Sequence, residues 1–341
     1  MARAIWMVLL LLGGLSSPLG ALAQGYEVGR ILSLEGGKAR VALNNGAVEA
    51  ELPQGGLRFQ VGERVVVFSE GGRHYVTEPD RIPWLVGLFF LFILFAVALG
   101  RGQGLRGVLG TLLGFLVLVY LVVPRIAAGG SPLGYALFGS LGVLLLSIYF
   151  VHGVNRKTTA ALLGTLLSVF FTLLLARLIA QALGFTGLAS EEALLLRQRG
   201  GVDLLSLWLA GVVVGTLGAL TDVTVTQASV VQALAHAHPG FGLWELYRRA
   251  MRVGYDHIGS LVNTLVFAYA SGSLPLFLLL TQDPTPVRFL VNTEPFAAEV
   301  VSMLLGSLGL LLAVPLTTFL ASSFFQGGSS PGGEGHPFHL H

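Results

Sequence analysis

Long apolar runs constrain this chain more than any other feature of its sequence. A helix needs about 20 apolar residues to cross roughly 30 Å of hydrocarbon. The chain is 54% hydrophobic and only 11% charged, whereas an ordinary soluble domain is roughly 25% charged. We therefore expect a polytopic α-helical membrane protein with about seven transmembrane helices in a bundle over residues 84–322. The apolar runs lie at 84–100, 105–123, 132–151, 158–183, 204–221, 258–281 and 299–322.

The first 23 residues have the pattern of an export signal. Arg3 precedes the apolar run 5–12, and the small-residue pattern Ala-Leu-Ala follows at 21–23. This order is typical of a secretory signal peptide. We expect residues 1–23 to be a signal peptide or, if uncleaved, a signal anchor. In both cases the next segment lies outside the cytoplasm.

Residues 25–80 are polar and alternate with a period of two. The runs 38–43 and 64–68 are separated by Gly-Gly pairs and by Asn45-Gly46, a pattern typical of β-hairpins. Several short strands in so few residues favour closure into a barrel, because closure removes exposed sheet edges. We expect a small extracytoplasmic β-barrel-like domain of the OB or SH3-like kind. An envelope protein is a possible partner of this domain.

Basic residues set the expected orientation, because Arg and Lys in short loops are retained on the cytoplasmic side. With the β domain outside, the cytoplasmic loops carry more of them than the outer loops, so the C-terminus is expected inside. The cytoplasmic set is Arg101, Arg106, Arg156, Lys157, Arg248, Arg249 and Arg252, and the outer set is Arg125, Arg197, Arg199 and Arg288.

The tail, 323–341, is rich in Gly, Ser and Pro and is expected to be a disordered cytoplasmic segment. Its three histidines could bind a metal weakly, but a solvated tail is the simpler interpretation, and we predict no metal site. They are His336, His339 and His341.

Several function classes find no support. The chain has no cysteine, which excludes disulfides and thiolate metal sites. No basic stripe with interleaved aromatics suggests a nucleic acid. No nucleophile elbow, zinc-binding His-Glu-x-x-His, Walker loop or dinucleotide fingerprint indicates an enzyme or a cofactor.

Polar residues near apolar runs are the candidates for function, since a charged side chain in hydrocarbon costs about 2.5–3.5 kcal/mol. The first cluster holds His152, Asn155 and Arg156, which in a helix share one face. The simpler interpretation makes Arg156 and Lys157 topology determinants and makes Asn155 or Thr158 a helix cap.

The second cluster, 218–229, surrounds Asp222. If the helix continues, Asp222, Thr226 and Ser229 form one stripe. If it breaks at 223–226, Asp222 caps a new helix, whose N-terminus could hold an anion.

The third cluster begins with the neighbours Asp256 and His257. Asp256 shares a helical stripe with Asn263, which is expected within the hydrocarbon and then needs a partner on another helix. In the same run, Gly272 and Pro275 predict a kinked or discontinuous helix, because proline removes a backbone donor.

A fourth, acidic cluster precedes the last apolar run. It includes Glu294 and Glu299, and we interpret it as a helix entry with Thr293 as cap and Pro295 at the first helical position. Two sets of small residues are spaced for close helix packing: Gly211, Gly215 and Ala219 in the run 204–221, and Ser302, Gly306 and Gly309 in the run 299–322.

These motifs, taken in order, resemble the YibE/F family of bacterial multi-pass membrane proteins. The resemblance implies a plasma (inner) membrane location and a candidate transport role without a substrate. Thr224 and Gln227 stand where the family pattern is more apolar, so neither is expected to act in a shared site. The matching motifs are His152-Gly153-x-Asn155-Arg156-Lys157-Thr158, Gly218-Ala219-x-x-Asp222-Val223, Ser260-x-x-Asn263-Thr264-Leu265 and Gly272-Ser273-Leu274-Pro275-Leu276.

The leading hypothesis is a transporter or permease for a small solute or ion. An alternative is a non-transporting receptor, regulator or envelope assembly factor. A third, an intramembrane hydrolase, requires the carboxylates of Asp222 and Asp256 within a few Å of each other. The predicted site lies toward the cytoplasmic side and comprises Asp222, His152, Asn155, Asp256, His257, Asn263, Ser229 and Thr226.

Overall fold

The chain forms two compact units in a computed structural model, residues 1–95 and 96–341. The structure describes residues 25–53, 55–282 and 284–327. The predicted signal segment and the three tail histidines lie outside the described residues.

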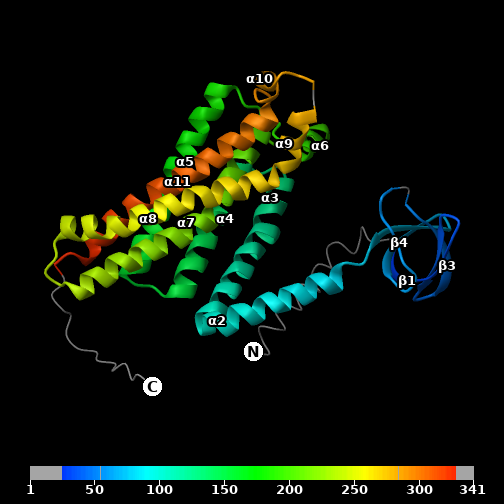
Figure 1. Cartoon of the computed structure of the whole chain (residues 1–341), viewed down its shortest axis with the longest axis horizontal. Coiled ribbons are helices and arrows are strands. Elements are labelled where there is room, and N and C mark those ends of the chain that lie inside the picture. The colour runs from blue at the N-terminus through cyan, green and yellow to red at the C-terminus, as the bar shows by residue number, and fades with distance from the viewer. Residues whose placement is uncertain (1–24, 54, 283, 328–341) are drawn as a thin grey trace. The chain divides into compact units, whose positions relative to one another are not determined.

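The N-terminal unit contains a closed barrel of five strands in the order β1-β2-β3-β5-β4 (Figure 1). Glycines with positive φ make the predicted tight turns, including Gly46 at 129° and Gly72 at 80°. The expected hairpins and barrel closure are therefore confirmed. The strands are β1 (Tyr26–Glu35), β2 (Lys38–Leu43), β3 (Gly46–Glu51), β4 (Arg64–Glu70) and β5 (Arg73–Pro79).

The barrel has its own apolar core, formed by alternate residues that point inward. Ile31, Val41, Val65 and Val67 are each at most 1% exposed. Gly29 lets two strands approach closely, because a Cβ there would lie 2.4 Å from Val41 Cγ1.

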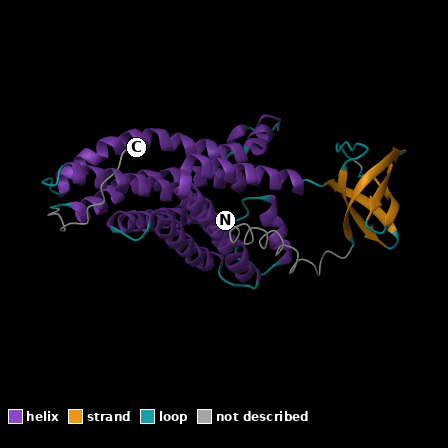
Figure 2. Ribbon diagram, turned by 90° about the horizontal axis from the view of Figure 1, so that it is seen from below, coloured by secondary structure: helices purple, strands orange, loops and turns teal. Residues whose placement is uncertain are grey.

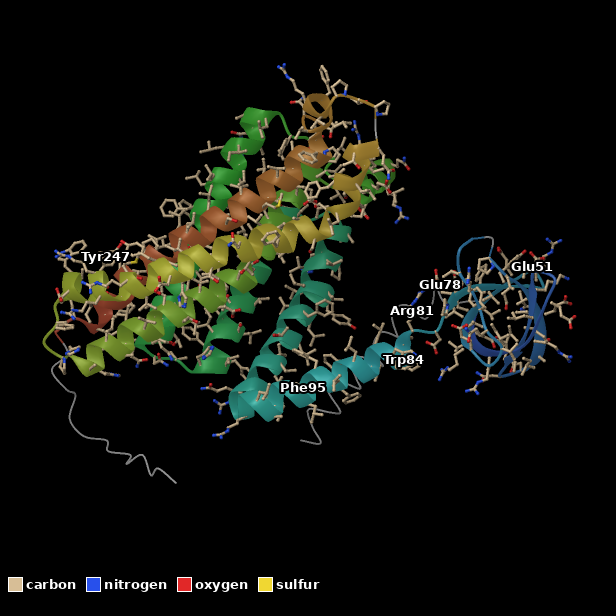
Figure 3. The ribbon with its side chains drawn as sticks, in the orientation of Figure 1. Glu51, Glu78, Arg81, Trp84, Phe95 and Tyr247 are labelled. Atoms are coloured by element: carbon tan, nitrogen blue, oxygen red, sulfur yellow. The ribbon has the colours of Figure 1, made fainter. Side chains whose placement is uncertain are left out.

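Charged pairs mark the junction between the barrel and the first apolar helix. Arg81 pairs with Glu78 at 2.9 Å and Arg64 pairs with Asp80 at 3.0 Å. Trp84 follows at the start of that helix, where its large side chain is exposed (Figure 3). Aromatic residues at such junctions are typical of the membrane interface.

Helices make up most of the remaining described residues, and Figure 2 shows several of them packed side by side in a bundle. The central helix α7 packs against α4, α5, α8 and α11, and α11 also packs against α5 and α8. The elements are α2 (Ile82–Leu116), η1 (Val117–Val122), α3 (Val123–Ala127), α4 (Pro132–Leu145), η2 (Leu146–Phe150), α5 (Arg156–Leu183), α6 (Glu191–Arg199), α7 (Leu204–Ala237), α8 (Leu243–Gly272), α9 (Leu274–Gln282), α10 (Val287–Leu290) and α11 (Glu294–Phe325).

Five segments are long and apolar enough to cross a membrane: 82–127, 132–150, 156–183, 204–237 and 294–325. The expected count of seven is not confirmed. The first two predicted runs fall within the single segment 82–127, but they are two helices joined at a kink at Arg101, whose φ is 49°. The sixth run is divided between α8 and α9.

One further boundary differs from expectation. Helix α11 continues to Phe325, so it includes the first residues of the segment predicted to be disordered. The ring of Phe325 lies against that of His236, with centroids 6.3 Å apart, and this contact accounts for the added turn.

Small residues allow the helices to approach closely. A Cβ on Gly215 would lie 2.7 Å from the Tyr269 hydroxyl, and one on Gly309 would lie 2.5 Å from Thr172 Oγ1. Both positions confirm the predicted close packing. Gly211 does not, because no heavy atom lies within 4 Å of its Cβ position.

Candidate functional site

Helix α7 runs without a break through Asp222. The continuous alternative is therefore correct, and Asp222 is not a helix cap. Two threonine hydroxyls near Asp222 form hydrogen bonds within the helix. Thr221 donates to the Leu217 carbonyl at 2.8 Å, and Thr224 donates to the Thr221 carbonyl at 3.1 Å. The true cap is Asp203, whose carboxylate accepts the Ser206 backbone N–H at 3.2 Å.

A groove of about 380 Å³ lies beside Asp222, between α7 and the helical segments α2–η1 and α4–η2. Ser140 is 3% exposed, and its Oγ has no hydrogen-bond partner among the described residues. A buried hydroxyl without a partner is uncommon and requires an explanation. The groove residues are Gly110, Thr111, Gly114, Phe115, Leu118, Ser140, Val143, Leu144, Ser147, Val214, Leu217, Gly218, Thr221 and Asp222.

Both walls that face α7 contain π-helical segments. Leu118 lies in η1 and Ser147 in η2, and both line the groove. π-Helical turns are rare and occur frequently at functional sites. Two of them beside one acidic residue distinguish this groove from a packing defect.

The loop after η2 differs from the predicted helix. Gly153 has a φ of 76°, which ends the helix, and Asn155 is extended. His152, Asn155 and Arg156 therefore do not share one helical face. Asn155 instead caps α5: its Oδ1 accepts the Thr158 backbone N–H at 3.0 Å, and Thr158 Oγ1 accepts the Asn155 backbone N–H at 2.9 Å.

Asn155 also positions the end of the preceding helix, because its side-chain Nδ2 donates to the His152 carbonyl at 3.2 Å. Partial burial and the charge of Lys157 lower the pKa of His152, while the Asp222 carboxylate acts in the opposite direction. The fold thus brings an imidazole and a carboxylate from distant parts of the sequence within electrostatic range of each other.

The remaining α7 candidates do not line the groove. Thr226 is exposed, and Ser229 Oγ donates to the Val225 carbonyl of its own helix at 2.7 Å.

Helix α8 presents Asp256 and Asn263 on an exposed face, with His257 half-buried. Its opposite face, which includes Leu246 and Ala250, is buried. Asp256 does not line the groove that contains Asp222, so this arrangement gives no support to a hydrolase dyad.

The predicted helix break lies between α8 and α9, and the predicted topology-determining basic residues lie in α5 and α8. Helix α8 ends at Gly272 and α9 begins at Leu274, with Pro275 as its second residue. Arg249 pairs with Glu245 one turn earlier, and its guanidinium lies 4.5 Å from the Phe241 ring centroid. Arg156 and Lys157 form the first turn of α5, and Arg248 and Arg252 lie in α8.

The acidic entry to α11 has a role that the sequence did not indicate. Glu294 accepts the backbone N–H groups of Thr186, Gly187 and Leu188 at 2.8, 2.7 and 3.1 Å, which ties α11 to the loop after α5. Helix α11 begins at Glu294, so Pro295 is its second residue and not, as predicted, its first. Thr293 provides no side-chain cap, because its hydroxyl donates to the Leu290 carbonyl instead.

A buried polar network was missed by sequence reasoning. Thr165 and Thr224 share a hydrogen bond of 2.7 Å between α5 and α7. Gln227 Nε2 donates to the Ala250 carbonyl at 3.2 Å and to Thr318 Oγ1 at 2.8 Å. The helical spacing of Thr224 and Gln227 with the apolar Leu220 and Val231 is the sequence signal that could have placed them in the core.

No group of three or more His, Asp or Glu side chains in the described parts of the chain could hold a metal ion. No curated protein and no solved structure matches the chain. A family model described as "YibE/F-like protein" matches residues 88–327, which include every residue of the groove and of the buried network. The chain belongs to the YibE/F-like protein family.

Proposed function

We propose that this protein is a transporter whose solute-binding site is the groove beside Asp222. The observation that carries the proposal is the unpartnered, buried Ser140 hydroxyl in the same groove as a carboxylate. Polar groups left unpaired between membrane helices are typical of substrate and ion pathways.

The chemistry of the groove favours a cation. Its polar side chains are one carboxylate and the hydroxyls of Thr111, Ser140, Ser147 and Thr221, and neither Arg nor Lys is among the lining residues. Hard cations prefer oxygen ligands. A single negative charge best balances a monovalent ion or a singly charged solute.

His152 gives the groove a means of coupling to protons. An imidazole titrates in the physiological range, and the carboxylate of Asp222 influences its charge. Binding of a cation at Asp222 would remove part of the attraction that holds a proton on His152. Binding of the cation would then favour release of the proton from His152, which is the coupling that a cation–proton exchanger requires.

The proposal includes the bacterial plasma membrane as location, with the barrel outside and the C-terminus inside. His152 and the start of α5 are then cytoplasmic, and the proposal places the Asp222 end of the groove toward that side. The five-stranded barrel, in the order β1-β2-β3-β5-β4, is proposed as an OB-like module.

Transport by purified protein in liposomes tests the proposal. Fluxes of Na⁺, K⁺ and H⁺ are measured for the wild type, Asp222→Asn and Ser140→Ala, with Thr226→Ala as control on the same helix. We expect Asp222→Asn to abolish the flux and Thr226→Ala to leave it unchanged. A folded Asp222→Asn variant with the wild-type flux would refute the site, whereas a folded wild type that carries none of the three ions would favour the receptor alternative.

A further inference from the structure

The outward face of α8 carries a stripe of polar side chains. The inner face packs tightly: a Cβ on Gly254 would lie 2.7 Å from Val314 Cγ1 and 3.2 Å from Gln227 Nε2. On the opposite side, Asp256, Ser260 and Asn263 are exposed. They follow one another at intervals of three or four residues, so they form a continuous stripe.

Asn263 is an exposed amide within a predicted apolar run. It lies two helical turns beyond Asp256, next to the apolar sequence Leu265-Val266-Phe267, and Phe267 is 72% exposed. Its side chain makes no hydrogen bond with any residue that the structure describes. We take the predicted apolar run 258–281 to lie in the membrane, where hydrocarbon would offer this amide neither donor nor acceptor. The exposed face would then need a polar partner.

We propose that the stripe formed by Arg252, Asp256, Ser260 and Asn263 binds a second copy of this chain in a two-fold symmetric dimer. Two copies inserted in the same direction place equivalent residues at the same depth. An amide both donates and accepts hydrogen bonds, so Asn263 is complementary to the Asn263 of the second copy.

The charges on the stripe are also self-complementary. Arg252 and Asp256 lie one turn apart, and both are exposed. Across a two-fold axis, each Arg252 meets the Asp256 of the second copy, which forms two equivalent pairs. A different partner would need the same pattern of charges by coincidence, whereas a second copy supplies it by symmetry.

Small residues allow the close approach that such hydrogen bonds require. Ser260, Thr264, Ala268 and Gly272 recur at intervals of four, and all are exposed. Small residues at this spacing let two membrane helices bring their backbones together.

Cysteine cross-linking tests the interface directly, because the chain has no native cysteine. Single Ser260→Cys and Asn263→Cys variants are oxidised in native membranes, with Leu174→Cys as control, since Leu174 is 45% exposed on α5. We expect covalent dimers at positions 260 and 263 and none at 174. Equal cross-linking at all three positions, or none at any, would overturn the proposal.

A charge exchange separates the interface from a general loss of folding. Asp256→Arg is expected to weaken dimerisation at least about tenfold, because it sets like charges against each other. The double variant Arg252→Asp with Asp256→Arg restores the opposite pairs and should restore the dimer. Light scattering during serial dilution in detergent measures the dimer dissociation of the single and the double variant. A double variant as weak as the single one would contradict the proposal. A monomeric wild type would also contradict the proposal if the cysteine of Asn263→Cys does not react with a thiol reagent. That result would show that another segment covers this face.

Discussion

At the scale of single residues, the electrostatic interaction between Asp222 and His152 carries the functional interpretation. The carboxylate raises the pKa of His152, whereas partial burial and Lys157 lower it. Asp222→Asn should therefore lower the pKa of His152, and Lys157→Gln should raise it. Histidine NMR in detergent measures both shifts, with the resonance assigned by its loss in His152→Gln. An unchanged pKa in Asp222→Asn would show that the two groups do not interact.

The same imidazole predicts how stability depends on pH. The folded protein holds the pKa of His152 below the ordinary value of 6.5, so the folded state binds its proton less readily than the unfolded state. Its contribution to stability is present above pH 6.5 and is lost as the pH falls through that range. Thermal unfolding at several pH values should show a smaller loss in acid for His152→Gln than for the wild type. Parallel curves would contradict this.

Two glycines in neighbouring helices should respond to alanine with opposite signs. A Cβ on Gly164 would lie 2.1 Å from Thr317 Oγ1, whereas the space beside Gly211 is open. Gly164→Ala should destabilise the bundle by about 1–3 kcal/mol through overpacking. Gly211→Ala should stabilise α7 by about 0.5–1 kcal/mol through reduced backbone entropy. Thermal unfolding of the two variants measures both stability changes. Equal changes in Gly164→Ala and Gly211→Ala would rule out close packing at Gly164.

At the scale of secondary-structure elements, the α5 cap offers a test of the loop that holds His152. Asn155→Ala removes a side chain that accepts the Thr158 backbone N–H and donates to the His152 carbonyl. We expect a loss of about 1 kcal/mol in unfolding free energy. Asn155→Asp keeps the side-chain acceptor and should retain most of this unfolding free energy. Chemical denaturation of the three proteins gives the comparison, and a neutral Asn155→Ala would show that the cap contributes nothing.

The elements also show what the sequence could and could not predict. Hairpin turns at Asn45-Gly46 and apolar helices depend on local pattern, so both were predicted. The interruption at Arg101 depends on one backbone conformation, which composition does not encode. Asp222 was found because a carboxylate in an apolar run is costly. Ser140 was missed because an isolated serine there resembles a packing residue until the fold places it in the groove.

At the scale of the whole molecule, the division into two units predicts that the barrel folds without the membrane. Residues 25–80 contain all five strands and a core that they fill by themselves, with Val65 fully buried. A domain this small is only marginally stable, but barrel closure leaves no open edge to aggregate. Residues 25–80 expressed alone should be soluble and unfold in one cooperative transition by circular dichroism.

A matched pair of substitutions in this fragment separates true folding from residual structure. Val65→Asp places a charge in the barrel core and should abolish the transition, because a buried carboxylate without a partner is strongly unfavourable. Val61→Asp makes the same chemical change at a side chain that is 62% exposed, and should leave the transition intact. If both variants melt like the parent fragment, the barrel does not form on its own, and its stability must then come from the helix that follows.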